Sequence, residues 1–251
     1  MHTTGRLDRG DGIGLAWRRQ DGNSPTVVFL PGFGSDMTGE KATALAAFCT
    51  ECGQAMLRFD YSGHGASGGR FEDGTISRWT DDALATIDRR TDGPLILVGS
   101  SMGGWIALLA ALARRDRVAA LIGIAAAPDF TEALMWPAMS VRQRAALKRD
   151  GVVHRPSQYG EPTPITRALI EDGRTRLVLN APIELDCPVR LLHGQNDPDV
   201  PWETALRITE RISSNDVQVI LVKDGDHRLS RPQDILLLRR TLTALLGQDG
   251  A

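Results

Sequence analysis

The sequence has 251 residues and a formal net charge of −2, with 42% apolar and 24% charged residues. This length suits one large domain with a substantial core, and the composition is ordinary for a globular protein. The nearly balanced charge does not support nucleic-acid binding or attraction to an anionic membrane. No apolar run is long enough to span a bilayer, and the first residues contain no apolar signal core. We therefore expect a cytoplasmic protein without a membrane span.

Strand-like and helix-like segments alternate along most of the chain. The first twenty residues predict an antiparallel edge hairpin, with a turn at Asp11-Gly12. The segments expected after it are strands at 26–30, 55–59, 95–98, 118–124, 189–192 and 217–222, and helices at 38–52, 75–90, 104–113, 202–212 and 232–246. This alternation favours an α/β fold, with a mostly parallel central sheet and helices on both faces.

The interval from 129 to about 185 interrupts the alternation. It contains helix-like pieces and five prolines, but no clear buried strand. Since it lies between two strands of the expected sheet, the simplest interpretation is a single domain, residues 1–251, with a helical lid inserted over the carboxyl edge of the sheet. The alternative is a helical excursion with only a structural role.

Residues 99–103, Gly-Ser-Ser-Met-Gly, fit the G-x-S-x-G frame. An apolar strand precedes them and an apolar helix-forming segment follows, so Ser101 is expected on a sharp turn that exposes its hydroxyl. Glycine is needed at Gly99 and Gly103 because a Cβ at either position would crowd the turn. Ser101 is therefore the candidate nucleophile.

A serine nucleophile needs a base to accept its proton, and the base needs an orienting acid. Of the five histidines, His227 follows the last strand and precedes the last helix, at the carboxyl edge of the sheet. His193 ends a strand, and its ring is expected to brace the following loop. Asp197 in that loop is the candidate acid, with Asp199 as the alternative. The order Ser, Asp, His is typical of folds that carry this serine turn.

Attack on a carbonyl carbon places negative charge on the carbonyl oxygen, which backbone N–H groups stabilise. The N–H of Met102, directly after the candidate nucleophile, is one expected donor. The turn at 31–34, Pro-Gly-Phe-Gly, follows an early strand, and its glycines let the backbone approach a substrate. We assign the second donor of the oxyanion hole to the N–H of Phe33.

The inserted segment offers adaptable apolar and aromatic side chains that suit an acyl chain. The candidates for a substrate pocket are Leu134, Met135, Trp136, Met139 and Tyr159. Ordinary packing of the insertion on the core explains the same residues. Five basic residues lie between Arg142 and Arg155. We expect a solvated helix face there, and the alternative is attraction of an anionic leaving group.

Two further motifs do not indicate a cofactor or a metal. Residues 49–52 are formally C-x-x-C, but they fall late in a predicted helix, and no second cysteine or histidine pair completes a zinc site. Residues 63–68 match G-x-G-x-x-G, but a loop follows where a dinucleotide site requires a helix. We therefore expect no cofactor and no bound metal.

From residue 26 to 228, these motifs resemble those of the α/β-hydrolase superfamily and follow its order. The segments that carry the resemblance are 31–34, 60–67, 99–105, 192–202 and 226–228. More narrowly, residues 58–63, 97–101 and 190–194 are similar to the abhydrolase-domain group of palmitoyl-protein thioesterases and acyl-glucuronide esterases. The resemblance implies the α/β-hydrolase fold, with Ser101 as nucleophile, Asp197 as acid and His227 as base.

We therefore expect a serine hydrolase that cleaves carboxylic esters or thioesters through an acyl-enzyme. Its substrate would be a small-molecule ester or thioester, or an acyl-protein, and the sequence leaves the oligomeric state open. Two alternatives remain. One is a different activity on the same fold, such as a peptidase, a carbon–carbon bond hydrolase or a perhydrolase. The other is a non-catalytic member that only binds a ligand.

Overall fold

The central element of the protein is a sheet with the strand order β1-β2-β4-β3-β5-β6-β9-β10. The computed structural model describes residues 2–157 and 160–247. The strands are β1 (His2–Asp8), β2 (Gly14–Gln20), β3 (Asn23–Leu30), β4 (Gln54–Phe59), β5 (Leu95–Ser100), β6 (Val118–Ile124), β9 (Val189–Gly194) and β10 (Val217–Val222). The hairpin of β1 and β2 is antiparallel, as is the pair of β2 and β4, whereas the other neighbours are parallel.

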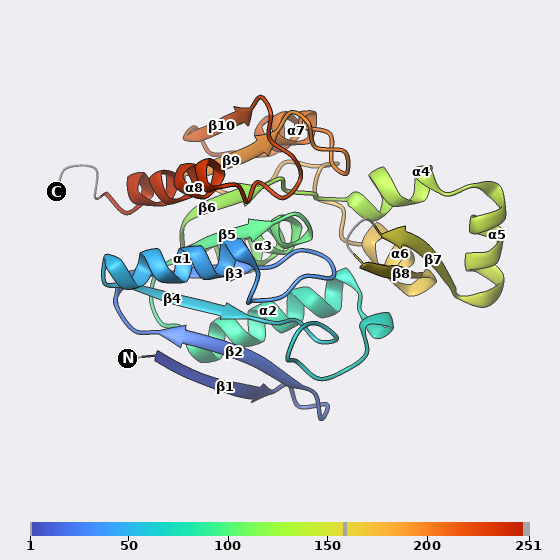
Figure 1. The fold of residues 1–251 in the computed structure, drawn as a ribbon, viewed down its shortest axis with the longest axis horizontal. Helices are drawn as coiled ribbons and strands as arrows, with labels where there is room; N and C mark the ends of the chain where they lie inside the picture. The colour runs from blue at the N-terminus through green and yellow to red at the C-terminus, as the bar shows by residue number, and fades with distance from the viewer. Residues whose placement is uncertain (1, 158–159, 248–251) are drawn as a thin grey trace.

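Helices cover both faces of the sheet (Figure 1). They are α1 (Glu40–Glu51), α2 (Ile76–Arg90), α3 (Met102–Ala113), α7 (Glu203–Arg211) and α8 (Pro232–Leu245). Leu45 of α1 and Leu238 of α8 belong to one buried cluster. Trp79 of α2 and Trp105 of α3 belong to the other. The expected α/β fold with a mostly parallel sheet is therefore confirmed.

The middle of the sheet explains why its strands read as continuous apolar runs. Every residue of β5 is buried, because helices cover both faces of a parallel strand. Parallel strands also end at the same edge of the sheet. The turn after β3 at 31–34, the turn at Ser101 and the loops after β9 and β10 therefore meet there, and their side chains can form one site.

The chain leaves the sheet between β6 and β9. This insertion contains a π-helical turn (Thr131–Met135), α4 (Trp136–Ala138), α5 (Val141–Asp150), the antiparallel hairpin of β7 (Val152–Ser157) and β8 (Gly160–Thr166), and α6 (Arg167–Arg174). It extends away from the sheet (Figure 1). The sequence indicated only helical pieces here. The hairpin was missed because its strands contain prolines and polar residues and do not join the main sheet.

Asp129 ties the two ends of the insertion together. Its side chain is only 4% exposed, and its carboxylate oxygens accept hydrogen bonds from the N–H groups of Val178 (2.8 Å) and Leu179 (3.0 Å). Burial raises the pKa of Asp129, and the two N–H donors oppose that rise. Buried hydrogen bonds therefore join the segment by which the chain leaves the core to the segment by which it returns. No helix in the described part of the chain is long and apolar enough to cross a membrane.

Candidate active site

Ser101 occupies the sharp turn between β5 and α3. Its φ is +55°, a conformation that side chains rarely adopt, and its N–H donates to the carbonyl of Ile124 (2.9 Å). The flanking glycines are required by close packing. A Cβ on Gly99 would lie 2.2 Å from the carbonyl oxygen of Gly103, and a Cβ on Gly103 would lie 2.0 Å from that of Leu30. The strain at Ser101 is thus held by the surrounding backbone.

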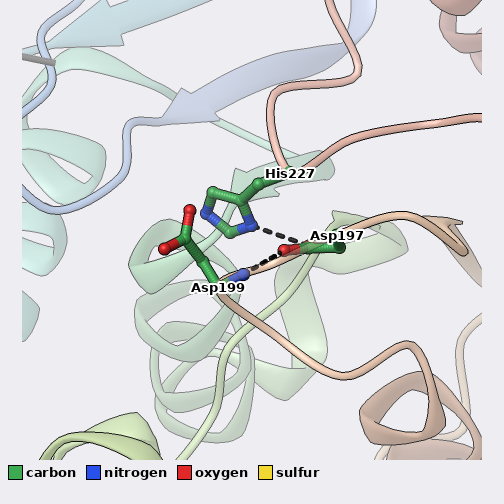
Figure 2. Close-up of side chains that lie close together, drawn as sticks. All are labelled: Asp197, Asp199 and His227. Atoms are coloured by element: carbon green, nitrogen blue, oxygen red, sulfur yellow. Dashed lines mark hydrogen bonds and ion pairs between the residues drawn. The ribbon is translucent and has the colours of Figure 1, made fainter. Parts of the chain in front are cut away.

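His227 lies between the serine and a carboxylate. Its Nε2 is 3.0 Å from Ser101 Oγ. Its Nδ1 is 2.7 Å from Asp197 Oδ2, a contact drawn in Figure 2. A carboxylate oxygen accepts a hydrogen bond, so Nδ1 carries the hydrogen and Nε2 presents a lone pair to the serine hydroxyl. The three side chains that the sequence placed in separate loops therefore form one hydrogen-bonded chain.

The Asp197 carboxylate is held by several donors. Its side chain is fully buried, and Oδ1 accepts hydrogen bonds from the N–H groups of Asp199 (2.8 Å) and Val200 (2.9 Å). Burial alone would raise the pKa of Asp197. Hydrogen bonds from the rings of His193 and His227 outweigh burial and hold this pKa well below its usual value. The lowered pKa favours the anionic form of Asp197, which accepts these hydrogen bonds.

Asp199, the alternative acid, stands on the other side of the imidazole from Asp197 (Figure 2). One ligand atom from each of Asp197, Asp199 and His227 lies within 4.8 Å of the others, a grouping that could hold a metal ion. However, His227 Nδ1 and the Asp197 oxygens already bond to one another and to backbone N–H groups. These hydrogen bonds account for the cluster, and they bring Asp197, not Asp199, to Nδ1.

The turn at 31–34 lies directly against the serine. A Cβ on Gly32 would be 3.3 Å from Ser101 Cβ, and Phe33 and Met102 both line the cavity that contains Ser101. Met102 is the first residue of α3, and the N–H groups of a first helical turn have no acceptor within their own helix. The two backbone positions expected to hold an oxyanion are therefore close to the serine hydroxyl.

His64 is a further residue of this site, and the sequence analysis gave it no role there. It is only 4% exposed, and its ring packs among Tyr61, Phe71 and Trp79. Its Nδ1 lies 3.2 Å from a carbonyl oxygen of the preceding turn, and its Nε2 accepts the N–H of Gly34 (3.2 Å). Burial lowers the pKa of His64, which favours the neutral ring that this pattern requires. His64 thus holds the peptide directly after Phe33.

A cavity of about 830 Å³ opens at Ser101 and His227. Its apolar lining includes Phe33, Phe130, Leu134, Met135, Ile165 and Val200, and its polar lining includes Asp36, Glu40, Lys41, Arg155, Arg228 and Ser230. Of the pocket candidates, Leu134 and Met135 line this cavity, whereas Trp136 and Met139 are not among its described lining residues. Tyr159 lies outside the described residues.

Trp136 has a different environment. Its ring lies between the guanidinium groups of Arg144 (4.9 Å) and Arg174 (4.6 Å). Arg149, in the same basic stretch, pairs with the exposed Asp150. The exposed Arg149 fits the expected solvated helix face, whereas Arg144 packs against Trp136. Arg155 alone of that stretch lines the cavity.

Lys41, in the first turn of α1, contacts the loop that carries His227. Its Nζ donates to the carbonyl oxygen of Arg228 and lies 3.4 Å from Ser230 Oγ. Burial and the charge of Arg228 lower the pKa of Lys41 to about 8. Lys41 therefore joins α1 to the wall of the cavity next to the imidazole.

The C-x-x-C motif lies away from this cavity, at the end of α1. Both of its cysteines are free thiols. Burial raises the pKa of Cys49 to about 12, so this thiol stays protonated and unreactive.

Comparison with known proteins identifies the family. The sequence profile of Hydrolase_4, described as "Serine aminopeptidase, S33", matches residues 22–170. The chain belongs to this family. It is also 43% identical to human "Palmitoyl-protein thioesterase ABHD10, mitochondrial" over 242 residues, which cover 96% of this chain and 79% of the relative.

Solved structures agree with this assignment. A hydrolase from Agrobacterium vitis S4 matches 98% of this chain with a TM-score of 0.94 and 44% identity, and 99% of that protein is covered. Mouse "Alpha/beta hydrolase domain-containing protein 10" matches with a TM-score of 0.90 and 41% identity over 98% of this chain and 99% of its own. The α/β-hydrolase fold and the expected family are confirmed, and the protein is a hydrolase.

One sequence-based expectation is wrong. We expected a cytoplasmic protein, because the first residues contain no apolar signal core. Relatives from human, cattle and mouse that are 42–43% identical are named mitochondrial. The expectation failed because it relied only on the lack of an apolar segment, and that criterion detects secretory signals and membrane spans but not other targeting information.

Proposed function

We propose that the protein hydrolyses carboxylic esters or thioesters, with Ser101 as nucleophile, His227 as base and Asp197 as orienting acid. The observation that carries the proposal is the continuous contact from Ser101 Oγ to His227 Nε2 (3.0 Å) and from Nδ1 to Asp197 Oδ2 (2.7 Å). A serine hydroxyl is a weak nucleophile, and this arrangement supplies both the base and the group that orients it.

The reaction proceeds in two halves. Ser101 Oγ attacks the acyl carbon while its proton passes to His227 Nε2. The bond to the leaving group then breaks, and His227 gives the proton to the departing alcohol or thiol, which leaves an acyl group on Ser101. A water molecule next loses a proton to Nε2 and attacks the acyl carbon. The acid departs as Ser101 Oγ recovers its proton. Asp197 stays ionised throughout and stabilises the imidazolium form of His227.

The N–H groups of Phe33 and Met102 serve as the oxyanion hole in this proposal. Both residues line the cavity at Ser101, and Met102 stands at the N-terminus of α3, where the helix dipole favours negative charge. Loss of one such donor costs about a hundredfold to a thousandfold in turnover in comparable enzymes. The charge that develops on the substrate is thus stabilised by backbone rather than by side chains.

We propose further that the insertion at 129–185 is a lid on a single domain and that the acyl chain lies beneath it. Leu134 and Met135 of the insertion line the cavity together with Phe33 and Phe130. A volume of about 830 Å³ is within the usual range for small-molecule sites. The relatives named as palmitoyl-protein thioesterases cover most of this chain, which favours a thioester with a long acyl chain as substrate.

The test is active-site labelling followed by substrate profiling. A fluorophosphonate probe should label Ser101, and peptide mapping locates the adduct. Matched p-nitrophenyl esters and acyl thioesters of increasing chain length then give kcat/KM for each class. Ser101→Ala should abolish labelling and turnover. The thermal unfolding temperature of this variant should equal that of the wild-type protein. Turnover retained by that variant would refute the assignment.

The family description favours one alternative, an aminopeptidase, because the matching profile is named for that activity. A panel of aminoacyl p-nitroanilides distinguishes the two functions. The proposal expects hydrolysis of thioesters and esters to exceed that of these amides by orders of magnitude. Labelling of Ser101 without turnover of any substrate would instead favour a binding protein.

A further inference from the structure

His193 is a buried histidine outside the proposed Ser101–His227–Asp197 array. It lies at the carboxyl end of β9 and is 1% exposed. Its Nε2 lies 3.1 Å from the carbonyl oxygen of Val200 and 3.2 Å from Asp197 Oδ2. Both partners are acceptors, so Nε2 must carry the hydrogen and is shared between them. The ring therefore donates to the same carboxylate oxygen that accepts from His227.

This contact completes the hydrogen bonding of the Asp197 carboxylate. Two backbone N–H groups hold Oδ1, and the two imidazole rings of His227 and His193 hold Oδ2. A carboxylate offers about four lone-pair directions, so four donors fix its plane. Without His193, only His227 would hold Oδ2, and rotation of the carboxylate would be opposed on one side only.

The backbone around His193 is built to keep this geometry. Asn196 N–H donates to the carbonyl of Gly225 (2.9 Å), which links the Asp197 loop to the loop that carries His227. A Cβ on Gly194 would lie 2.3 Å from the same Gly225 oxygen, so the two loops touch at the residue after His193. The position of His193 is therefore coupled to that of both partners.

We propose that His193 is a positioning residue for the hydrolytic reaction, which holds Asp197 Oδ2 in line with Nδ1 of His227. This inference rests on the proposed function. His193 does not contact the substrate and transfers no proton. Its N–H keeps the carboxylate in place while the imidazole takes up and releases the serine proton.

The experiment compares His193→Phe with His193→Gln. Phenylalanine fills the buried space without a donor, whereas the glutamine amide places an N–H near the position of Nε2. We expect His193→Phe to lower kcat by about 10- to 100-fold with little change in KM, as expected for a misplaced reacting group. The rate of fluorophosphonate labelling should fall in parallel. His193→Gln should retain most of both rates.

The pH profile separates positioning from a merely structural role. With one donor removed, the contact between Asp197 Oδ2 and His227 Nδ1 changes, so the acid limb of kcat/KM should move in His193→Phe and stay in place in His193→Gln. Asp199, Arg228 and Lys41, which line the same cavity as the imidazole, are unchanged in both variants. Leu192→Val is the matched control, because Leu192 is buried in the cluster on the other face of the sheet. It should lower stability without moving the acid limb.

The outcomes are distinct. If His193→Phe folds cooperatively and keeps kcat within about twofold with an unchanged pH profile, the inference is overturned. Equal loss in the folded Phe and Gln variants also overturns it, since the donor would then be irrelevant. If Ser101 of the wild-type protein is not labelled, the proposed function itself has failed.

Discussion

The carboxyl edge of the sheet and the insertion between β6 and β9 are held together by different interactions. At the edge, buried carboxylates accept hydrogen bonds from backbone N–H groups, as Asp197 does from Asp199 and Val200. In the insertion, half-exposed charged groups dominate, including the Arg174–Glu132 pair and the guanidinium groups around Trp136. Buried, fully satisfied hydrogen bonds fix geometry, whereas exposed ion pairs add little stability. The difference is consistent with the proposed function, in which a rigid reacting centre lies beside a lid.

The largest effect should come from replacing Asp197, the proposed acid at the carboxyl edge of the sheet. We expect Asp197→Asn to lower kcat by about ten-thousandfold, because an amide can face Nδ1 with its NH₂ and favour the wrong imidazole tautomer. Steady-state kinetics with a thioester measures the loss. Asp199→Asn is the matched control from the same loop, and we expect it to lower kcat by less than about tenfold. Similar losses of kcat in the two variants would contradict the assignment of Asp197 as the acid.

The next effect concerns His64, which accepts a hydrogen bond from Gly34 in the turn proposed to hold the oxyanion. His64→Leu removes the acceptor of the Gly34 N–H and should lower kcat by about 10- to 100-fold with KM nearly unchanged, since the loss is felt in the transition state. Binding of a trifluoromethyl ketone, which mimics that state, should weaken by the same factor. A change in KM alone would contradict this role.

His64 also predicts a pH dependence of stability. Burial lowers the pKa of His64 in the folded state below its ordinary value of 6.5. Between those two pKa values, His64 binds a proton in the unfolded chain but not in the folded protein. The stabilising contribution of neutral His64 to the free energy of unfolding is therefore present above pH 6.5 and is lost as the pH falls toward the folded-state pKa. Urea denaturation at a series of pH values should show this loss in the wild-type protein. His64→Leu should flatten the curve in that interval.

Stability measurements sharpen the comparison of the two regions. Asp129→Ala leaves the buried N–H groups of Val178 and Leu179 without acceptors, and we expect it to cost about 2–4 kcal/mol. Glu132→Ala breaks only the half-exposed pair with Arg174 and should cost less than about 1 kcal/mol. Equal losses in the free energy of unfolding, measured by chemical denaturation, would mean that the exposed ion pair stabilises the protein as much as the buried Asp129 hydrogen bonds do.

The smallest effect should be on substrate preference. Met135 lines the cavity and Met139 is not among its described lining residues, so the pair offers a matched test within the insertion. Met135→Ala should change the ratio of kcat/KM between long and short acyl thioesters by about three- to tenfold, an effect worth about 1 kcal/mol. Met139→Ala should leave that ratio unchanged. A change in that ratio in the Met139 variant alone would indicate that the acyl chain binds near Met139 and not near Met135.

Some of these features were predictable because they depend on short stretches of sequence. A buried parallel strand such as β5 must be apolar on both faces, and the turn after it requires Gly99 and Gly103 for steric reasons. Both requirements can therefore be recognised in the sequence. The hairpin of β7 and β8 has no such pattern, because its strands lie outside the main sheet and tolerate proline.

The site was predictable only in part for a similar reason. Side chains at strand ends, such as His227 and Asp197, are indicated by their place in the alternation of strands and helices. Supporting contacts are not, since they join residues far apart in the chain. His64 reaches Gly34 across a hydrogen bond spanning thirty residues, and neither residue carries a pattern that points to the other.

The order of apolar segments and the glycines of the serine turn thus specified an α/β sheet and the loops that could carry a nucleophile, a base and an acid. Packing decided the rest. The sequence preferred Asp197 to Asp199, and the folded chain places Asp197 at Nδ1 of His227. Only the folded chain brings His193 to Asp197 Oδ2 and His64 to Gly34, and puts Met135 but not Trp136 among the described lining residues of the cavity. Periodicity records which face of an element is buried, whereas hydrogen-bond geometry depends on how distant elements are oriented in space.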